Sequence, residues 1–184
     1  MNGTLVSSWP EKQLRPPYVT IGLTLVCLFL YLVYASLSPM AQQAMIDLSG
    51  MQPAVVAALL ARPLPEWWNA TALSLFTAML LHDSWLHLLG NLGYLWVFGI
   101  KVEQRLGAFG MLLLFFAGGA LANTIVALRL PLLETPIFGA SGAVSAVIGA
   151  YLGLFPARHI GRFLPLGLYL QFARGPAIFV IGSW

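Results

Sequence analysis

Two short polar segments interrupt strongly apolar sequence, and they contain the side chains best suited to chemistry. The first begins at His82, ends at Asn91 and contains His87; the second surrounds Ser141 with glycine and alanine. Polar groups at membrane depth cost several kcal/mol unless they are paired, so such residues are functional candidates. Together the segments supply a possible nucleophile, the Ser141 hydroxyl, and possible hydrogen-bond donors to an oxyanion.

His87 and Asn91 lie four residues apart, and on an α-helix this spacing places both side chains on one face. Their N–H groups can then donate to a single point, as a developing oxyanion requires, and each such donor contributes about 10²–10³ in rate. His82 points away from this pair or lies at the entrance to the helix. A metal site is not expected, because asparagine is a poor zinc ligand and no cysteine or carboxylate cluster converges here.

Ser141 is preceded by Pro136 and has small neighbours on both sides. We expect a loop that enters a helix at or just after the serine, with a hydroxyl that Gly139 and Gly142 leave accessible. Residues 141, 145 and 149 form a face that is small at every fourth position, which is typical of close helix contacts in lipid. A packing role is the commoner one for a lone serine or histidine in such sequence, so no single residue decides the function.

The composition indicates the environment of the chain. Of 184 residues, 59% are hydrophobic and only 8% are charged, and the mean hydropathy is +0.84. A soluble domain carries about 25% charged residues. We therefore predict an integral, multi-pass membrane protein whose main contact is the lipid bilayer. Nucleic-acid binding is not expected, because the net charge of +3 comes without a clustered basic face.

Five apolar segments are predicted to be membrane-embedded helices, because backbone groups in lipid must be hydrogen-bonded internally and no period-two alternation suggests strands. The segments are residues 18–38, 71–99 with a polar insertion at 82–87, 109–128, 141–156 and 164–183. The fold class is thus all-α, a polytopic helical bundle. Residues 1–17 precede the transmembrane domain, 18–184. Residues 39–70 are expected to form a long loop with one short interfacial helix over 54–61.

The distribution of basic residues predicts the orientation of the bundle. Six basic residues fall on the side of the N-terminus and two on the other, and cytoplasmic loops are the ones that accumulate Lys and Arg. The six are Lys12, Arg15, Lys101, Arg105, Arg158 and Arg162; the two are Arg62 and Arg129. We expect a cytoplasmic N-terminus, with His82 and Ser141 toward the outer side.

Jointly, the two motifs resemble one family. The spacing His82-x4-His87-x3-Asn91 followed by Gly139-x-Ser141-Gly142 is similar to that of the rhomboid intramembrane serine proteases, and residues 76–99, 103–107 and 139–151 resemble the family pattern around it. The resemblance runs from about residue 18 to the end of the sequence. It implies a rhomboid-like bundle with about five of an expected six transmembrane helices.

The resemblance also implies roles. Ser141 would be the nucleophile that attacks a peptide bond in a transmembrane protein substrate, and His87 and Asn91 would form the oxyanion hole. His82, Gly139 and Gly142 would be accessory residues. The family needs no metal and no cofactor. The expected location is a bacterial-type plasma (inner) membrane.

A general base is the part of the machinery that the sequence lacks. A base must lie within about 2.6–3.2 Å of the serine, and in rhomboid proteases it is a histidine of the sixth helix. His159, at the expected cytoplasmic end of the fourth span, would lie roughly 25–30 Å from Ser141. We therefore expect the sequence to be truncated before the sixth helix and the polypeptide alone to be inactive or nearly so.

The alternative is a non-catalytic rhomboid-like protein that binds transmembrane clients. A channel or transporter would require paired intramembrane carboxylates or repeat symmetry, which the sequence lacks.

Overall fold

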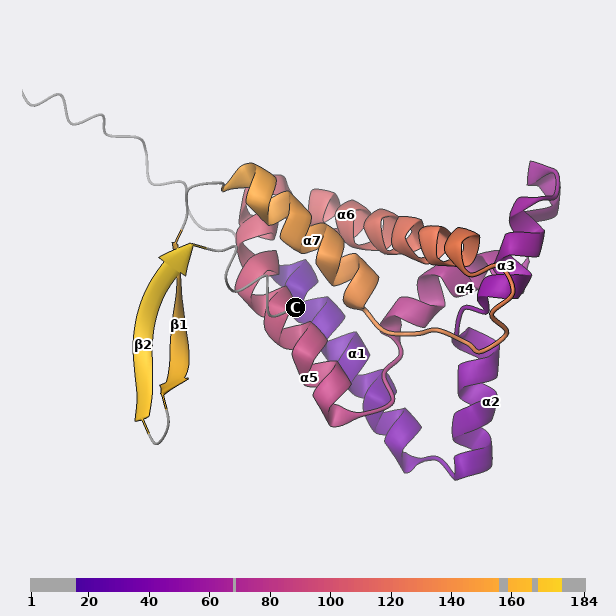
Figure 1. The fold of residues 1–184 in the computed structure, drawn as a ribbon, viewed down its shortest axis with the longest axis horizontal. Helices are drawn as coiled ribbons and strands as arrows, with labels where there is room; N and C mark the ends of the chain where they lie inside the picture. Colours follow the sequence, from indigo (N-terminus) through magenta and orange to yellow (C-terminus); the bar gives the residue numbers. More distant parts are fainter. Residues whose placement is uncertain (1–15, 68, 156–158, 167–168, 177–184) are drawn as a thin grey trace, which may run out of the picture.

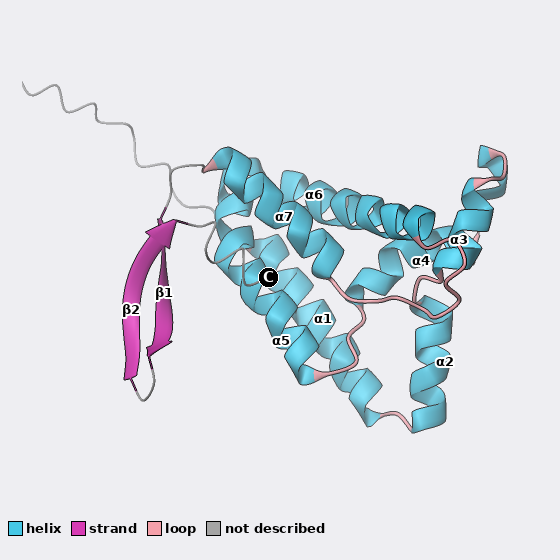
Figure 2. Cartoon of the chain, viewed as in Figure 1, coloured by secondary structure: helices cyan, strands magenta, loops and turns pink. Residues whose placement is uncertain are grey.

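The chain forms a bundle of helices with a β-hairpin beside it (Figures 1 and 2). The computed structural model describes residues 16–67, 69–155, 159–166 and 169–176. The helices are α1 (Tyr18–Ser36), α2 (Pro39–Ser49), α3 (Pro53–Leu60), α4 (Ala70–Thr77), α5 (Trp85–Tyr94), α6 (Ile100–Arg129) and α7 (Ser141–Leu154). Short 3-10 turns span Leu64–Trp67 and Ala78–Leu80, and a π-helical turn, Leu95–Gly99, joins α5 to α6. The predicted all-α bundle is confirmed for the body of the molecule.

Helices α6 and α7 pack closely because small residues face each other between them. A Cβ atom added to Gly118 would lie 2.3 Å from the Cβ of Ala146, and one on Gly142 would lie 2.7 Å from the Cβ of Ala122. Backbones can approach this closely in lipid only where side chains are small. The predicted contact face, residues 141, 145 and 149, is instead exposed in the described part of the chain. Among the described residues, the glycines of α6 pack against the adjacent stripe of α7, so close contact at the face of residues 141, 145 and 149 stays a prediction.

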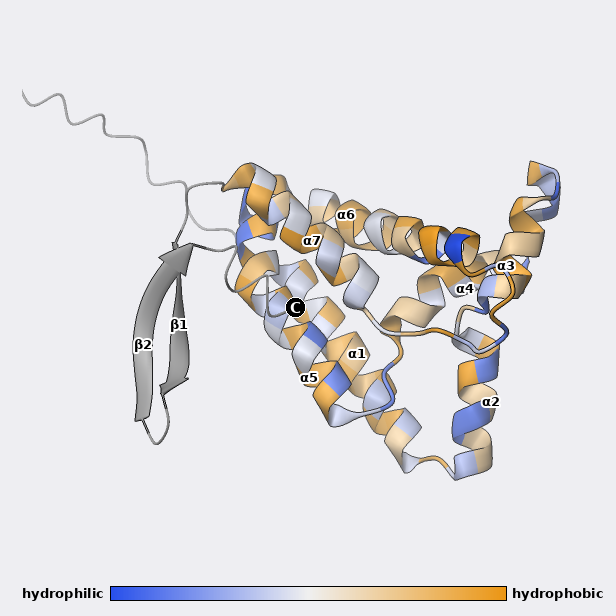
Figure 3. Ribbon diagram, viewed as in Figure 1, coloured by the Kyte–Doolittle hydropathy of each residue, from blue (hydrophilic) through white to orange (hydrophobic). Residues whose placement is uncertain are grey.

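The run from α5 through α6 is kinked at Gly107, where a positive φ of 79° interrupts the helical backbone. Only glycine adopts this conformation without steric cost. Two helical runs among the described residues, Tyr18–Ser36 and Trp85–Arg129, are long and apolar enough to cross a membrane, and Ala70–Leu80 and Ser141–Leu154 are shorter apolar helices. Apolar colour dominates these helices in Figure 3. The predicted segment 71–99 is therefore divided, with a non-helical connection at 81–84 between its two parts.

A buried carboxylate fixes the start of α1 against the start of α6. Glu103, which is 3% exposed, accepts hydrogen bonds of 2.8 Å from the backbone N–H groups of Val19 and Thr20 and from the Thr20 hydroxyl. The residue before α1, Pro17, provides no side-chain cap. Glu103 thus satisfies N–H groups that a helix start leaves free, and its charge is favourable at the positive end of the helix dipole.

The connection between the first two spans contains more helix than the sequence indicated. The predicted helix over 54–61 is confirmed as α3, but α2 was not expected. Its signal is present: Ser38 caps the helix by accepting a hydrogen bond from the Ala41 N–H, and Pro39 occupies the first turn. An antiparallel bridge then ties Met51 to Ile137, just before α7.

The prediction of a helix over 164–183 is wrong for the residues that the structure describes there. Strand β1 (His159–Leu166) pairs antiparallel with β2 (Tyr169–Pro176), from His159 opposite Pro176 to Leu166 opposite Tyr169. Prolines at 165 and 176 lack the N–H that a helix interior needs, and Phe163, Tyr169 and Phe172 favour strands. Residues 177–183 of the predicted helix lie outside the described residues.

Candidate active site

Helix α5 brings His87 and Asn91 onto one face, as their spacing predicts. Ser84 caps the helix: its backbone is extended, and its hydroxyl accepts a 3.3 Å hydrogen bond from the His87 N–H. One turn later, the Asn91 side-chain amide donates to the His87 carbonyl at 3.0 Å. Asn91 is 3% exposed, and its Oδ1 atom has no partner among the described residues. The helix therefore holds both side chains in place but leaves part of the hydrogen-bonding capacity of Asn91 unused among the described residues.

Ser141 is the first residue of α7, and the strand-like segment before it is anchored on both sides. Ile137 pairs with Met51, and the Gly139 N–H donates to the Ala78 carbonyl at 2.8 Å. Gly139 has a positive φ of 121°, and a Cβ atom added to it would lie 2.5 Å from Nε2 of His87. Glycine is therefore required here twice, by its backbone conformation and by the imidazole beside it.

The predicted nucleophile and both predicted oxyanion donors line a single cavity of about 300 Å³. Its walls are formed by Leu86, His87, Gly90, Asn91 and Ser141, and it opens between α5 and the start of α7. The first intrahelical bond of α7 runs from the Val144 N–H to the Ala140 carbonyl, so the N–H groups of the first turn are the free donors of a helix start. The cavity thus combines a hydroxyl with several hydrogen-bond donors.

His82 lies beside this group but not in the cavity. Its ring centroid is 5.0 Å from that of His87, and the side chain is 2% exposed in the non-helical connection before α5. Neither ring nitrogen has a hydrogen-bond partner of good geometry among the described residues. Burial first, and the neighbouring His87 second, lower the pKa of His82 to about 4, although the backbone of Leu80 opposes the shift. A neutral, buried imidazole fits a supporting role.

Asp83 is a polar neighbour that the sequence analysis missed. Its Oδ1 atom lies 3.1 Å from Nδ1 of His87 and accepts a 3.3 Å hydrogen bond from the Ser84 hydroxyl. Partial burial is the largest single effect and raises the pKa of Asp83. The hydrogen bond with His87, the backbone and Ser84 hydrogen bonds and the charge interaction with His87 together outweigh it, so the pKa lies below its usual value. The available signal was the four-residue spacing between Asp83 and His87, which brings two side chains together on a helix.

Comparison with known proteins identifies the family. A family model, the Rhomboid domain, matches residues 64–183. The chain belongs to the rhomboid family. It is 39% identical over 80 residues to Rhomboid-like protein 11, chloroplastic, of Arabidopsis thaliana, and 34% identical over 87 residues to the Putative rhomboid protease YdcA of Bacillus subtilis (strain 168). These matches cover 44% and 47% of this chain but only 26% and 41% of the two relatives.

As a member of the rhomboid family, the chain is an integral membrane protein built from apolar helices. No group of three His, Cys, Asp or Glu side chains among the described residues has the geometry to hold a metal ion.

The third histidine of this rhomboid chain is remote from the serine. His159 begins β1, beyond the opposite end of α7 from Ser141. Helix α7 has 14 residues, which corresponds to about 21 Å at 1.5 Å per residue. Because His159 follows the end of this helix, the described backbone does not bring it to Ser141.

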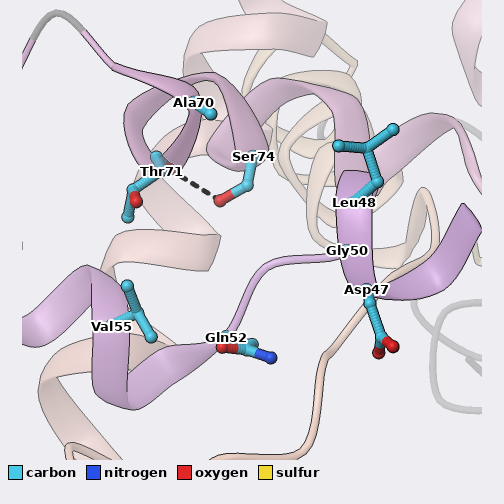
Figure 4. Close-up of a pocket in the computed structure, with 8 residues that line it drawn as sticks. All are labelled: Asp47, Leu48, Gly50, Gln52, Val55, Ala70, Thr71 and Ser74. Atoms are coloured by element: carbon cyan, nitrogen blue, oxygen red, sulfur yellow. Dashed lines mark hydrogen bonds between the residues drawn. The ribbon is translucent and has the colours of Figure 1, made fainter. Parts of the chain in front are cut away.

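A second cavity, of about 190 Å³, lies between the ends of α2 and α3 and the first turns of α4 (Figure 4). Ser74 faces it and donates its hydroxyl hydrogen to the Thr71 carbonyl at 2.6 Å. Asp47 and Gln52 contribute the other longer polar side chains. None of the predicted site residues lines this cavity, so the candidate active site is the one at Ser141.

Proposed function

We propose that the chain is the core of an intramembrane serine endopeptidase that cleaves transmembrane protein substrates. The observation that carries this proposal is the convergence of Ser141, His87 and Asn91 on one cavity in a chain of the rhomboid family. Three residues separated by up to 54 positions in the sequence meet there. Packing alone does not require a hydroxyl, an imidazole and an amide to share one opening.

In the proposed reaction, Oγ of Ser141 attacks the carbonyl carbon of the scissile peptide bond, and the carbonyl oxygen takes up negative charge. That oxyanion would receive hydrogen bonds from His87, from the second hydrogen of the Asn91 amide and from the N–H of Ser141. The N-terminal end of α7 adds a favourable dipole, and donors fixed in advance stabilise charge without reorganisation. His82, Gly139 and Gly142 support these groups without contacting the reacting atoms.

The hydroxyl proton of Ser141 requires a base, and no described histidine fits that role. His82 lies outside the cavity, His87 is assigned to the oxyanion, and His159 is beyond the far end of α7. We therefore propose that the 184-residue polypeptide by itself is inactive or nearly so. The same observation favours a second candidate function, a rhomboid-like protein that binds transmembrane clients without cutting them.

Labelling with a fluorophosphonate, which reacts with activated serines, separates the two functions. The product of the natural gene, in its own membrane, should be labelled, and Ser141→Ala should abolish the label. Ser145→Ala is the matched control, because Ser145 lies one turn further along the same exposed face of α7, and it should remain labelled. Absence of label on the natural product would favour the binding function, and persistent label on Ser141→Ala would refute the nucleophile. The isolated 184-residue chain should label little.

We also propose a multi-pass location in a bacterial-type plasma membrane with a cytoplasmic N-terminus. Lys101 and Arg105 are exposed just before the bend at Gly107, and the cavity lies at the other end of this helical stretch, at the start of α5. Cys27 is fully buried, so single cysteines introduced elsewhere report orientation. Lys101→Cys should react with an impermeant maleimide only from the cytoplasmic side, and Leu132→Cys only from outside. The reverse pattern would invert the topology.

A further inference from the structure

The contact between Asp83 and His87 constrains which nitrogen of the imidazole carries hydrogen. Oδ1 of Asp83 and Nδ1 of His87 are 3.1 Å apart, which is hydrogen-bonding distance. An ionised carboxylate only accepts hydrogen bonds, and Asp83 is held in its ionised form because its pKa lies below the usual value. Two acceptors do not form a hydrogen bond, so Nδ1 must be the donor.

The other nitrogen of the same ring faces the reaction site. A Cβ atom added to Gly139 would lie 2.5 Å from Nε2 of His87, and Gly139 precedes Ser141 by two residues. His87 and Ser141 line the same cavity. In a neutral imidazole with hydrogen on Nδ1, Nε2 carries a lone pair and accepts hydrogen bonds. Such a ring would repel a negatively charged oxygen instead of stabilising it.

We propose that Asp83 is a positioning residue for the oxyanion hole: its carboxylate holds His87 with Nδ1 protonated, so that Nε2 donates to an oxyanion only when the imidazole is positively charged. This inference rests on the proposed function, because it concerns the donor that the proposed acyl transfer uses. The resulting donor is a charged one, whose hydrogen bonds are about twice as strong as those of a neutral donor. Whenever the ring is charged, the negative charge of Asp83 beside Nδ1 compensates it.

Among the described residues around the His87 ring, Asp83 is the side chain that can fix which ring nitrogen carries hydrogen. In the described part of the chain, the ionisable side chains that interact with His87 are Asp83 and His82. His82 stays neutral near pH 7, since burial lowers its pKa to about 4, and it therefore does not supply a second charge. Phe138, from the segment before α7, adds an apolar ring with its centroid 6.4 Å from that of His87. Ser84 donates to the same Asp83 oxygen and orients it.

The protonation site is measurable without any reaction. The 184-residue chain, with ¹⁵N in its histidine rings, is placed in lipid nanodiscs, and nitrogen NMR distinguishes a protonated from a bare ring nitrogen. The sequence has three histidines, so loss of signals in His87→Gln assigns the ring of interest. In the neutral ring we expect hydrogen on Nδ1. In Asp83→Asn, loss of the charged acceptor should lower the ratio of the Nδ1–H to the Nε2–H form by about tenfold.

Ser84→Ala is the matched control, because it removes the helix cap and a hydrogen bond to Asp83 but keeps the carboxylate. It should retain hydrogen on Nδ1. Hydrogen on Nε2 in the unmodified chain, or an unchanged ratio in Asp83→Asn, would overturn the inference. An equal loss in Ser84→Ala would also overturn it, since the cap and not the carboxylate would then set the tautomer. Each of these results leaves the fluorophosphonate test of Ser141 unaffected, so failure of the inference and failure of the proposed function are distinguishable.

Discussion

Two polar clusters lie at opposite ends of the helical stretch between the start of α5 and the bend at Gly107, and they differ in how completely their hydrogen bonds are satisfied. At Glu103, three donors converge on one buried carboxylate at 2.8 Å. By contrast, Asn91 in the wall of the Ser141 cavity and His82 beside it are as deeply buried as Glu103 yet retain atoms without partners among the described residues. The two clusters are separated by about 24 Å, the length of 16 helical residues between His87 and Glu103.

The difference separates polar residues that hold the fold from polar residues left available to a ligand. A satisfied buried carboxylate stabilises the packing of two helices, and any change there costs free energy. Unpartnered buried atoms already cost free energy in the folded state, so a compensating use is the natural explanation. The comparison predicts that substitutions at Glu103 change stability more than reactivity, and that substitutions at the cavity do the opposite.

The largest effect is expected for Asn91→Ala, measured as the rate of fluorophosphonate labelling of the natural gene product. Loss of one oxyanion donor should slow labelling by about 10²–10³-fold, or roughly 2.7–4 kcal/mol in activation free energy. Asn123→Ala is the matched control, because Asn123 also donates its amide to a backbone carbonyl, that of Leu75, outside the cavity. Labelling of Asn91→Ala at the unmodified rate would remove Asn91 from the proposed oxyanion hole.

At the opposite cluster, Glu103→Gln should lower the free energy of unfolding by roughly 3 kcal/mol, because a carboxamide presents N–H groups to donors that need acceptors. Thermal unfolding in detergent measures the change. Glu66→Gln is the control: Glu66 makes only an exposed 3.7 Å ion pair with Arg62, and such pairs contribute about 0–1 kcal/mol. If both variants unfold at the temperature of the parent, Glu103 does not hold the bundle together.

The buried His82 predicts a pH dependence of stability. Its pKa is about 4 in the folded chain and 6.5 in the unfolded chain, so the unfolded chain binds the proton first as the pH falls. Stability should be constant above about pH 7.5 and decrease by about 2.5 kcal/mol between pH 6.5 and 4. His82→Leu, which removes the titrating group, should flatten this part of the profile in chemical denaturation. An identical slope in both proteins would assign the effect to other groups.

The smallest effect is expected at Gly139. Gly139→Ala adds a Cβ atom beside Nε2 of His87 at a φ of 121°, which should cost about 1–2 kcal/mol in stability and displace the imidazole. Gly149→Ala, within the following helix α7, is the control, because nothing lies within 4 Å of its added Cβ atom. The change there should be neutral or slightly stabilising. Comparable losses in both variants would show that contact with His87 is not the cause.

The sequence predicted the helical bundle and the residues that meet at the cavity, because both depend on local spacing and on apolar segment length. His87 and Asn91 share a face as a four-residue spacing requires, and Ser141 begins a helix as its small neighbours indicated. Asp83 was missed because its importance depends on the orientation of one imidazole. The role of Glu103 was missed because its partners lie 83 and 84 residues away.

The β-hairpin was missed for a different physical reason. The apolar content of residues 164–183 is compatible with a helix or with strands. Segments of this hydropathy are distinguished mainly by their prolines and by their content of residues that favour strands. Likewise, the stripe of α7 that packs on α6 contains Gly142 and Ala146, because the small residues Gly118 and Ala122 of α6 face it. Which stripe of a helix is buried depends on its neighbour as well as on its own sequence.

The most direct test is to identify which residue carries the adduct after the natural gene product reacts with a fluorophosphonate. Peptide mass spectrometry reads this without assuming which serine is reactive. The contrast between the two clusters predicts a single phosphonylated residue, Ser141, with a rate that falls in Asn91→Ala and is retained by the folded fraction of Glu103→Gln. An adduct on Ser145 or on any residue outside the cavity, or a rate that depends on Glu103 instead of Asn91, would contradict it.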